Sequence, residues 1–437
     1  MAAHTGLALN ASGGLEMNLD DMIMISIDDH AIEAPGMFDD LMPAKYKDDA
    51  PKLVKGDNGM DQWLFQGETI GNAGLSAVVS LPKDEWSIDP TDLSEMRPGC
   101  YDLDARVADM DANGNLAGMN FPTFAGFAGT HLAKMPDKEL TEAAFCAYND
   151  WSIDVLSGGY PGRFIPLGII PYFDVDRAVK EIHRIAAKGC VAVSLPETPY
   201  GVGAPSFQSG YFDPIFQALC DTGMTPTMHI GGAFGLIQRP QEAIIDDLIL
   251  LAPQLMTITT SDIMTSGLLK KFPDLKFALA EGGIGWVPFF LDRLERHVVN
   301  QSWTGFDGLP AGMTPTEVWQ KHFLACFITD PSALNLRERI GINTIAWECD
   351  YPHSDCTWPY SPEVLKAELD AAGCSDADIN AITWKNVADF FNYDPFAHIK
   401  KEDATVGALR ARATKAGVDT STTSKAEYKR RYELANA

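Results

Sequence analysis

The chain has 437 residues, of which 46% are hydrophobic and 22% charged, and its formal net charge is −26. These values are typical of a globular chain long enough for one large barrel with insertions or for two domains. The acidic balance argues against nucleic acid or an anionic membrane surface as partners, and no apolar run reaches the length expected of a transmembrane helix.

The eight cysteines are scattered along the chain, without a CxxC pair or zinc-finger spacing. This usage favours reduced thiols and a cytoplasmic location over a disulfide framework. Residues 1–20 have the character of a loose leader that lacks the basic start and long apolar core of a signal peptide.

The first predicted strand, Met22–Ile27, ends in the polar residues Asp28, Asp29 and His30. Because side chains alternate along a strand, Asp28 and His30 share one face and Asp29 lies on the other. Such a pair can reach one cation, although an aspartate that only fixes a histidine tautomer explains it equally well.

The stretch 34–118 is irregular and rich in Asp, Gly and Pro, which predicts an insertion after the first strand. A short strand pair is expected around 63–70 and 75–81 within it. Gly118–Phe124 is predicted to be the second barrel strand, and His131 in the loop beyond is a further candidate, though a lone loop histidine is more often structural.

Strands and helices alternate regularly from residue 138 onward, which favours a parallel sheet. The pattern predicts strands over 163–171, 190–195, 225–230, 276–281, 322–329 and 344–347, and helices over 138–158, 174–188, 211–222, 248–255, 257–272 and 286–300. Two amphipathic helices follow over 362–372 and 376–391 and complete a main domain spanning 21–395. The charged tail, 396–437, is expected to be partly disordered or to pack on another subunit.

Four predicted strands end in ionisable residues, and this shared feature predicts where the chemistry lies. Asp28 and His30 follow the first strand, His229 and Glu281 each end a later one, and Asp350 with His353 follow the last. Strand ends lie in a row in an open sheet but converge on one axis in a closed barrel, so the pattern favours an α/β barrel. No GxGxxG follows the first strand and no P-loop is present, which weakens a nucleotide-binding alternative.

Asp28, His30, His229 and Asp350 form a mixed nitrogen and oxygen donor set. Such a set suits one divalent metal ion, with zinc first and manganese or iron as alternatives. An open coordination position would make the site catalytic.

Four groups of motifs stand out along the chain: Ile27–His30, Met228–His229, Phe272–Phe277 running into Glu281–Trp286, and Asp350–His353 with Trp358–Pro359. Together they resemble the amidohydrolase superfamily, specifically the amidohydrolase-2 branch that includes aminocarboxymuconate-semialdehyde and γ-resorcylate-type decarboxylases. The resemblance covers about residues 22–393. It implies a distorted (β/α)8 TIM barrel, one divalent metal held by the four residues named above, and a homodimer.

Two positions depart from this resemblance. The family often has His or Glu where this chain has Asp28, which is chemically competent. The decarboxylases usually carry a histidine at the position of Glu281, so their mechanism does not transfer directly.

Three functions follow from these observations. The first is a metal-dependent hydrolase of a small cyclic or aromatic substrate, with Glu281 as general base and Asp350 or His353 moving the proton. The alternative is a non-oxidative metal-dependent decarboxylase of an aromatic or muconate-type acid. The third, a binding protein on a degenerate barrel, is disfavoured by the nearly complete ligand set. Aromatic residues in the strand-end loops favour a ring-bearing substrate, although they also fit simple packing of the barrel mouth: Phe121, Phe124, Phe127, Tyr200 and Trp358.

Overall fold

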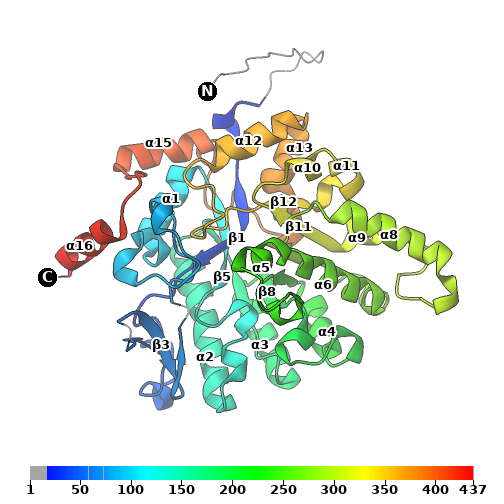
Figure 1. Cartoon of the computed structure of the whole chain (residues 1–437), viewed down its shortest axis with the longest axis horizontal. Coiled ribbons are helices and arrows are strands. Elements are labelled where there is room, and N and C mark those ends of the chain that lie inside the picture. The colour runs from blue at the N-terminus through cyan, green and yellow to red at the C-terminus, as the bar shows by residue number, and fades with distance from the viewer. Residues whose placement is uncertain (1–16, 58, 72, 437) are drawn as a thin grey trace.

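The structure, a computed structural model, describes residues 17–57, 59–71 and 73–436, and forms a distorted TIM barrel (Figure 1). Residues 1–16, most of the expected leader, lie outside the described part. The barrel strands are β1 (Ile25–Ala31), β5 (Ala117–Pro122), β6 (Phe164–Ile165), β7 (Leu167–Ile169), β8 (Ala192–Pro196), β9 (Thr225–His229), β10 (Phe277–Ala280), β11 (Phe323–Phe327) and β12 (Ile345–Trp347).

Parallel pairing joins these strands in chain order. One ladder runs β1-β5-β6 and the other β7-β8-β9-β10-β11-β12, and only Pro166 separates β6 from β7. The ring closes where the chain beyond β12 meets β1: Asp350 N–H donates to the Asp28 carbonyl (2.8 Å), and His30 N–H donates to the Tyr351 carbonyl (2.7 Å). Closure therefore joins the two segments that carry most of the candidate ligands.

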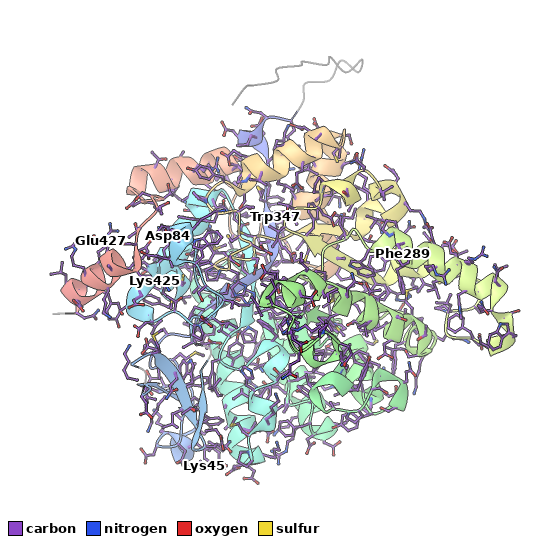
Figure 2. The ribbon with its side chains drawn as sticks, in the orientation of Figure 1. Lys45, Asp84, Phe289, Trp347, Lys425 and Glu427 are labelled. Carbon is purple, nitrogen blue, oxygen red and sulfur yellow. The ribbon has the colours of Figure 1, made fainter. Side chains whose placement is uncertain are left out.

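The strands are buried on both faces, as expected for parallel strands covered by helices. In β10, Phe277 and Leu279 pack against the outer helices, whereas Ala278 and Ala280 face the barrel interior. Trp347 of β12 is fully buried, whereas Phe289 on the outer helix α8 is 69% exposed (Figure 2). The covering helices are α2 (Lys138–Asp150), α3 (Val175–Ala186), α4 (Asp213–Thr222), α5 (Ile245–Leu251), α6 (Gln254–Thr265), α7 (Leu268–Lys271), α8 (Val287–Asn300), α9 (Pro315–His322), α10 (Pro331–Leu334), α11 (Arg337–Ile340), α12 (Ser361–Ala371), α13 (Asp376–Asn380) and α14 (Asn386–Phe391).

Helix α3 illustrates how the sequence forms these covering helices. Asp174 caps its N-terminus by accepting hydrogen bonds from the backbone N–H groups of Asp176 and Arg177. Ala178, Ile182 and Ile185 recur at helical spacing and form its buried face.

The segment between β1 and β5 is more regular than predicted over 34–118. It contains an antiparallel sheet of β2 (Lys52–Lys55), β3 (Asp61–Phe65) and β4 (Glu68–Ile70), whereas no strand forms over 75–81. Helix α1 (Leu103–Asn113) then precedes β5, so the irregular insertion ends well before residue 118. The hydrophobic pattern of α1 is weak because its buried face includes Arg106, Asp109 and Asn113.

The charged tail folds onto its own chain. Helices α15 (Val406–Ala416) and α16 (Lys425–Ala435) form there, and α15 packs against α1 (Figure 1). In α16, the Tyr428 side chain packs on Val78 and Leu81, and its hydroxyl lies 2.6 Å from Ser80 Oγ. These residues are therefore ordered rather than a disordered end, and the packing of the tail on another subunit stays a prediction.

The described residues contain one helical stretch, Ile245–Thr265, whose length and mean hydropathy of 1.2 are sufficient to cross a membrane. The expectation that no apolar stretch reaches this length therefore does not hold here. The core helix of a soluble protein passes the same test, and Ala252 and Pro253 separate the stretch into α5 and α6.

Candidate metal centre

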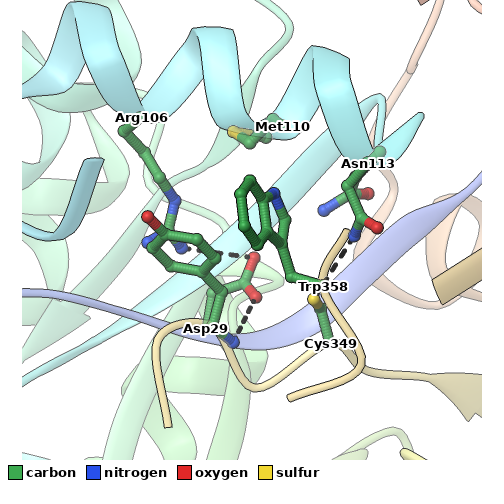
Figure 3. A pocket seen from close by; sticks show the side chains of 8 residues that line it. Asp29, Arg106, Met110, Asn113, Cys349 and Trp358 are labelled. Carbon is green, nitrogen blue, oxygen red and sulfur yellow. Dashed lines mark hydrogen bonds and ion pairs between the residues drawn. The ribbon is translucent and has the colours of Figure 1, made fainter. Parts of the chain in front are cut away.

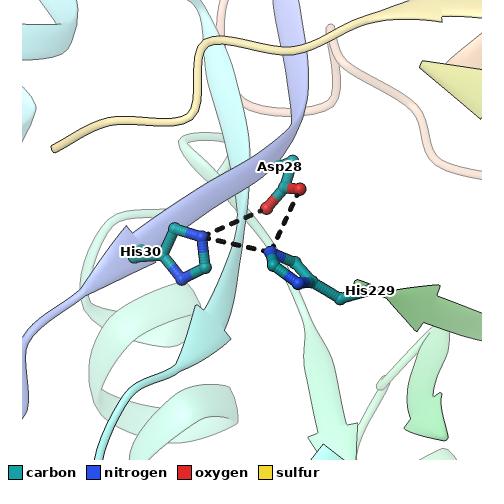
Figure 4. Close-up of side chains that lie close together, drawn as sticks. All are labelled: Asp28, His30 and His229. Atoms are coloured by element: carbon teal, nitrogen blue, oxygen red, sulfur yellow. Dashed lines mark hydrogen bonds and ion pairs between the residues drawn. The ribbon is translucent and has the colours of Figure 1, made fainter. Parts of the chain in front are cut away.

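The ends of β1, β9 and β12 bring the four predicted ligands together at the barrel mouth. His30 Nε2 lies 3.5 Å from Asp28 Oδ1, 3.4 Å from Asp350 Oδ1 and 3.3 Å from His229 Nε2. His229 Nε2 lies 3.3 Å from Asp28 Oδ2 (Figure 4). The donor atoms form two close groups, one of Asp28, His30 and His229 and the other of His30, Asp350 and His353, and His30 belongs to both.

Local bonds orient these side chains. His229 Nδ1 lies 2.5 Å from the Ile230 carbonyl oxygen, so Nδ1 carries the proton and the Nε2 lone pair faces the cluster. Asp350 adopts a positive φ of 57°, a conformation that aspartate tolerates better than most residues. The backbone bond from Asp350 to Asp28 holds this turn against β1.

Burial and charge make the cluster unfavourable without a cation. Burial, and then the neighbouring Glu348 and Asp350, raise the pKa of Asp28 well above its usual value. Burial would also raise the pKa of Asp350, but His353 and His30 lower it below its usual range. Burial lowers the pKa of His30, which keeps the imidazole neutral as a metal ligand requires.

The donor set fits one divalent ion. The carboxylate oxygens of Asp28 and Asp350 are buried, and the groups that the structure places against them are the imidazoles of the cluster: His30 and His229 lie 3.5 and 3.3 Å from Asp28, and His353 lies 2.7 Å from Asp350. Buried polar atoms normally have partners, and a cation among these oxygens would stabilise their ionised form. Oxygen and imidazole donors suit zinc, manganese or iron.

Glu281 and His353 lie at the open edge of the cluster. Glu281 Oε2 is 3.3 Å from His229 Nε2, and its side chain is 26% exposed. His353 Nδ1 is 2.7 Å from Asp350 Oδ1, its ring stacks on His30 at 4.0 Å, and its side chain is 12% exposed. Both side chains can therefore contact a substrate bound at the mouth.

Sequence reasoning did not assign a role to Glu348, which is 1% exposed beneath the cluster. Its Oε2 accepts hydrogen bonds from Glu281 N–H (3.0 Å) and from the Cys326 thiol. Burial raises the pKa of Glu348 to about 7. The available signal was its position directly after the predicted strand that ends at Trp347, two residues before Asp350.

The aromatic candidates separate into two groups. Phe127 stacks on His229 with ring centroids 4.0 Å apart, and Phe121 lies 4.7 Å from the same ring. Other aromatics contact different parts of the fold: Phe124 packs on Trp63, Trp358 packs on Tyr351, and Tyr200 is 44% exposed. The predicted loop candidate His131 contacts the carbonyl oxygen of Phe124.

Asp29 faces away from the cluster, toward helix α1. Its carboxylate lies 3.7 Å from Arg106, and Tyr351 N–H donates to it (3.2 Å) (Figure 3). The Tyr351 hydroxyl donates to Asp109 (2.6 Å), which also binds Arg97 through two hydrogen bonds. This network holds the loop after β12 in place on the side that faces α1, away from the metal-binding cluster.

Comparison with known proteins identifies related sequences and folds. A family model described as Amidohydrolase matches residues 61–393, a range that begins after Asp28 and His30. Similar solved structures include an amidohydrolase from Mycobacterium avium subsp. paratuberculosis K-10 (21% identity, TM-score 0.64, 85% of this chain and 99% of that chain). Others are 5-carboxyvanillate decarboxylase from Sphingomonas paucimobilis (20%, 0.57, 85% and 99%) and dihydroxybenzoic acid decarboxylase from Polaromonas sp. JS666 with bound manganese and the inhibitor 2-nitroresorcinol (16%, 0.55, 85% and 97%).

Proposed function

The chain belongs to the amidohydrolase family, and from this premise we propose that it is a non-oxidative, metal-dependent decarboxylase of an aromatic acid. The relatives named as decarboxylases support this choice over the hydrolase that the sequence first suggested. Because these relatives are at most 20% identical, the comparison establishes only the shared fold. The proposed reaction therefore also depends on the residues of this chain's own site.

The proposal depends on one observation: a buried cluster of potential metal ligands lies beside the aromatic ring of Phe127 and beside His353, which can transfer a proton. Phe127, stacked on His229, offers a face for a ring, while His353 contacts Asp350 at 2.7 Å. A bound divalent ion would supply a Lewis acid that holds the substrate carboxylate and an adjacent hydroxyl.

The protein residues then supply one proton to the substrate and replace it from solvent. Glu281 donates it to the ring carbon that carries the carboxylate and regains a proton from solvent, while Asp350 stays ionised beside His353, which exchanges its own proton with solvent. The bond between that carbon and the carboxylate breaks, its electron pair stays with the ring, and carbon dioxide leaves. One proton is consumed for each carbon dioxide released.

The hydrolase is the second candidate, and Glu281 favours it. The resemblance leads one to expect a histidine at this position in a decarboxylase, whereas a carboxylate 3.3 Å from His229 suits a general base for water. Metal identity also remains a proposal: the Polaromonas relative contains manganese, and this donor set accepts zinc as well.

Carbon dioxide release tests the proposal directly. The protein, loaded separately with manganese and zinc, is incubated with mono- and dihydroxybenzoates in deuterated water. The expected products are carbon dioxide and a phenol with one deuterium at the vacated ring carbon. Turnover of esters, amides or lactones without carbon dioxide from any acid would establish the hydrolase instead.

A further inference from the structure

The C-terminal tail reaches the loop after β12 through a turn formed by residues 76–81. The family match ends at residue 393, so helices α15 and α16 lie beyond it. Within the turn, the backbone N–H groups of Val78 and Val79 both donate to the Pro352 carbonyl oxygen, each at 3.1 Å. Pro352 directly precedes His353 in the sequence. Backbone hydrogen bonds thus connect this turn to a candidate proton-transferring residue at the barrel mouth.

Residues of the tail hold the turn in an uncommon backbone conformation. Ser80 has a φ of 63°, which a residue other than glycine adopts rarely and keeps only where surrounding groups hold it. Its carbonyl oxygen accepts a hydrogen bond from Thr423 N–H (2.9 Å), and its hydroxyl lies 2.6 Å from the Tyr428 hydroxyl. The Tyr428 ring is 5% exposed and packs on Val78 and Leu81. The conformation of the turn therefore depends on contacts from the far end of the chain.

A second connection between the tail and the same loop runs through Arg97. The Arg97 guanidinium donates to the Asp419 carbonyl oxygen (2.7 Å) and binds Asp109, which also accepts the Tyr351 hydroxyl (2.6 Å). The guanidinium also lies over the Trp358 ring, 4.3 Å from its centroid, an arrangement that attracts a cation to an indole. These two aromatic residues lie on either side of the catalytic part of the loop in the sequence. The tail therefore supports the loop on both sides of that part.

We propose that the tail takes part in the reaction as a brace, in which Tyr428 is a positioning residue for His353. The inference rests on the proposed function, because that function uses the braced loop. On the barrel side β1 holds this loop, since His30 N–H donates to the Tyr351 carbonyl oxygen (2.7 Å). On the outer side the tail holds it, and the two attachments together keep His353 at 2.7 Å from Asp350. We call the tail residues that make these contacts the tail brace: Asp419, Thr423 and Tyr428.

Variants of Tyr428 in the full-length, manganese-loaded protein test the tail brace. Tyr428→Ala removes both the ring and the hydroxyl, and should lower kcat for carbon dioxide release by about 10–100-fold at unchanged KM, because a displacement of about 1 Å caused far from the chemistry can cost 10²-fold. Tyr428→Phe keeps the ring packing and should recover most of the rate. Tyr160→Phe is the matched control, because the Tyr160 hydroxyl donates to Asp104 on the first turn of α1, also at 2.6 Å. It should leave kcat unchanged.

Chemical labelling reports the position of His353 independently of turnover. Diethyl pyrocarbonate acylates accessible imidazoles, and peptide mass spectrometry measures the rate at each histidine. The His353 side chain is 12% exposed, whereas His183 on α3 is exposed and serves as the internal reference. We expect the ratio of His353 labelling to His183 labelling to rise several-fold in Tyr428→Ala and to stay unchanged in Tyr160→Phe. Both rates are measured well below the Tm of each variant, so that global unfolding does not contribute.

The outcomes separate the tail brace from the proposed function. A wild-type kcat or a wild-type labelling ratio in Tyr428→Ala would overturn the brace and leave decarboxylation intact. Equal changes in Tyr160→Phe would overturn it as well, since loss of any such hydroxyl would then have the same effect. If the unaltered protein releases no carbon dioxide from any acid, the decarboxylase fails. The labelling ratio then still decides whether the tail positions His353: a raised ratio in Tyr428→Ala upholds the brace, and an unchanged ratio overturns it.

Discussion

Replacing Glu281 by Gln tests the proton-transfer role at the edge of the cluster most directly. The change preserves size and the backbone conformation, in which φ is 58°, and removes only the ionisable group. Glu281 Oε2 is 3.3 Å from His229 Nε2 and its side chain is 26% exposed, so the carboxylate reaches both the cluster and a substrate. Loss of a general acid or base costs about 10²–10⁴-fold in rate, equivalent to roughly 3–5 kcal/mol of activation free energy.

The assay is kcat for carbon dioxide release, with metal content and a melting curve measured on the same preparation. We expect kcat to fall by about 10²–10⁴-fold while metal content and Tm stay unchanged. Glu281→His is the matched control, because histidine tolerates a positive φ and can transfer a proton, so it should recover part of the rate. Wild-type turnover in Glu281→Gln would refute the reasoning, and loss of metal would make Glu281 a ligand instead.

The remaining predictions concern metal binding, pH, stability and assembly. Asp28→Asn combined with His30→Ala should remove the metal and abolish activity, and stoichiometric metal by elemental analysis would contradict the site. Burial raises the pKa of Glu33 to about 7 against 4.5, so the folded state binds its proton more tightly and stability should fall as pH rises from 4.5 to 7, by up to about 3 kcal/mol. Urea titrations of Glu33→Gln should lack this dependence. Arg97→Met breaks a buried ion pair with Asp109 (2.6 Å) and should cost about 3–5 kcal/mol of unfolding free energy in the same titrations. The expected homodimer stays a prediction, which light scattering at micromolar concentration checks.

The barrel could be predicted because its determinants are local in the sequence. Each strand is a short run of buried residues, such as Ala192–Pro196. The helices have apolar residues at regular spacing, as α3 does after its N-cap Asp174. The positions at strand ends then follow from topology, since parallel strands of a closed barrel place their carboxyl ends around one axis. This explains why residues from three distant segments were expected together: His30 Nε2 lies 3.5 Å from Asp28 and 3.4 Å from Asp350, and His229 Nε2 lies 3.3 Å from Asp28.

The same local signals fail where a polar side chain is buried by distant partners. Helix α1 buries Arg106, which donates to the His30 carbonyl and to Asn120, so its inner face has no apolar stripe that a sequence pattern would detect. Glu348 is buried for the same reason: its acceptor oxygen is satisfied by groups 22 and 67 residues away along the chain. A sequence shows that such a carboxylate would be costly to bury but does not show which strand supplies the donors. The role of Glu348 is therefore evident only in the folded barrel. There it accepts a hydrogen bond from the backbone N–H of Glu281, and this bond orients the Glu281 side chain toward the substrate site.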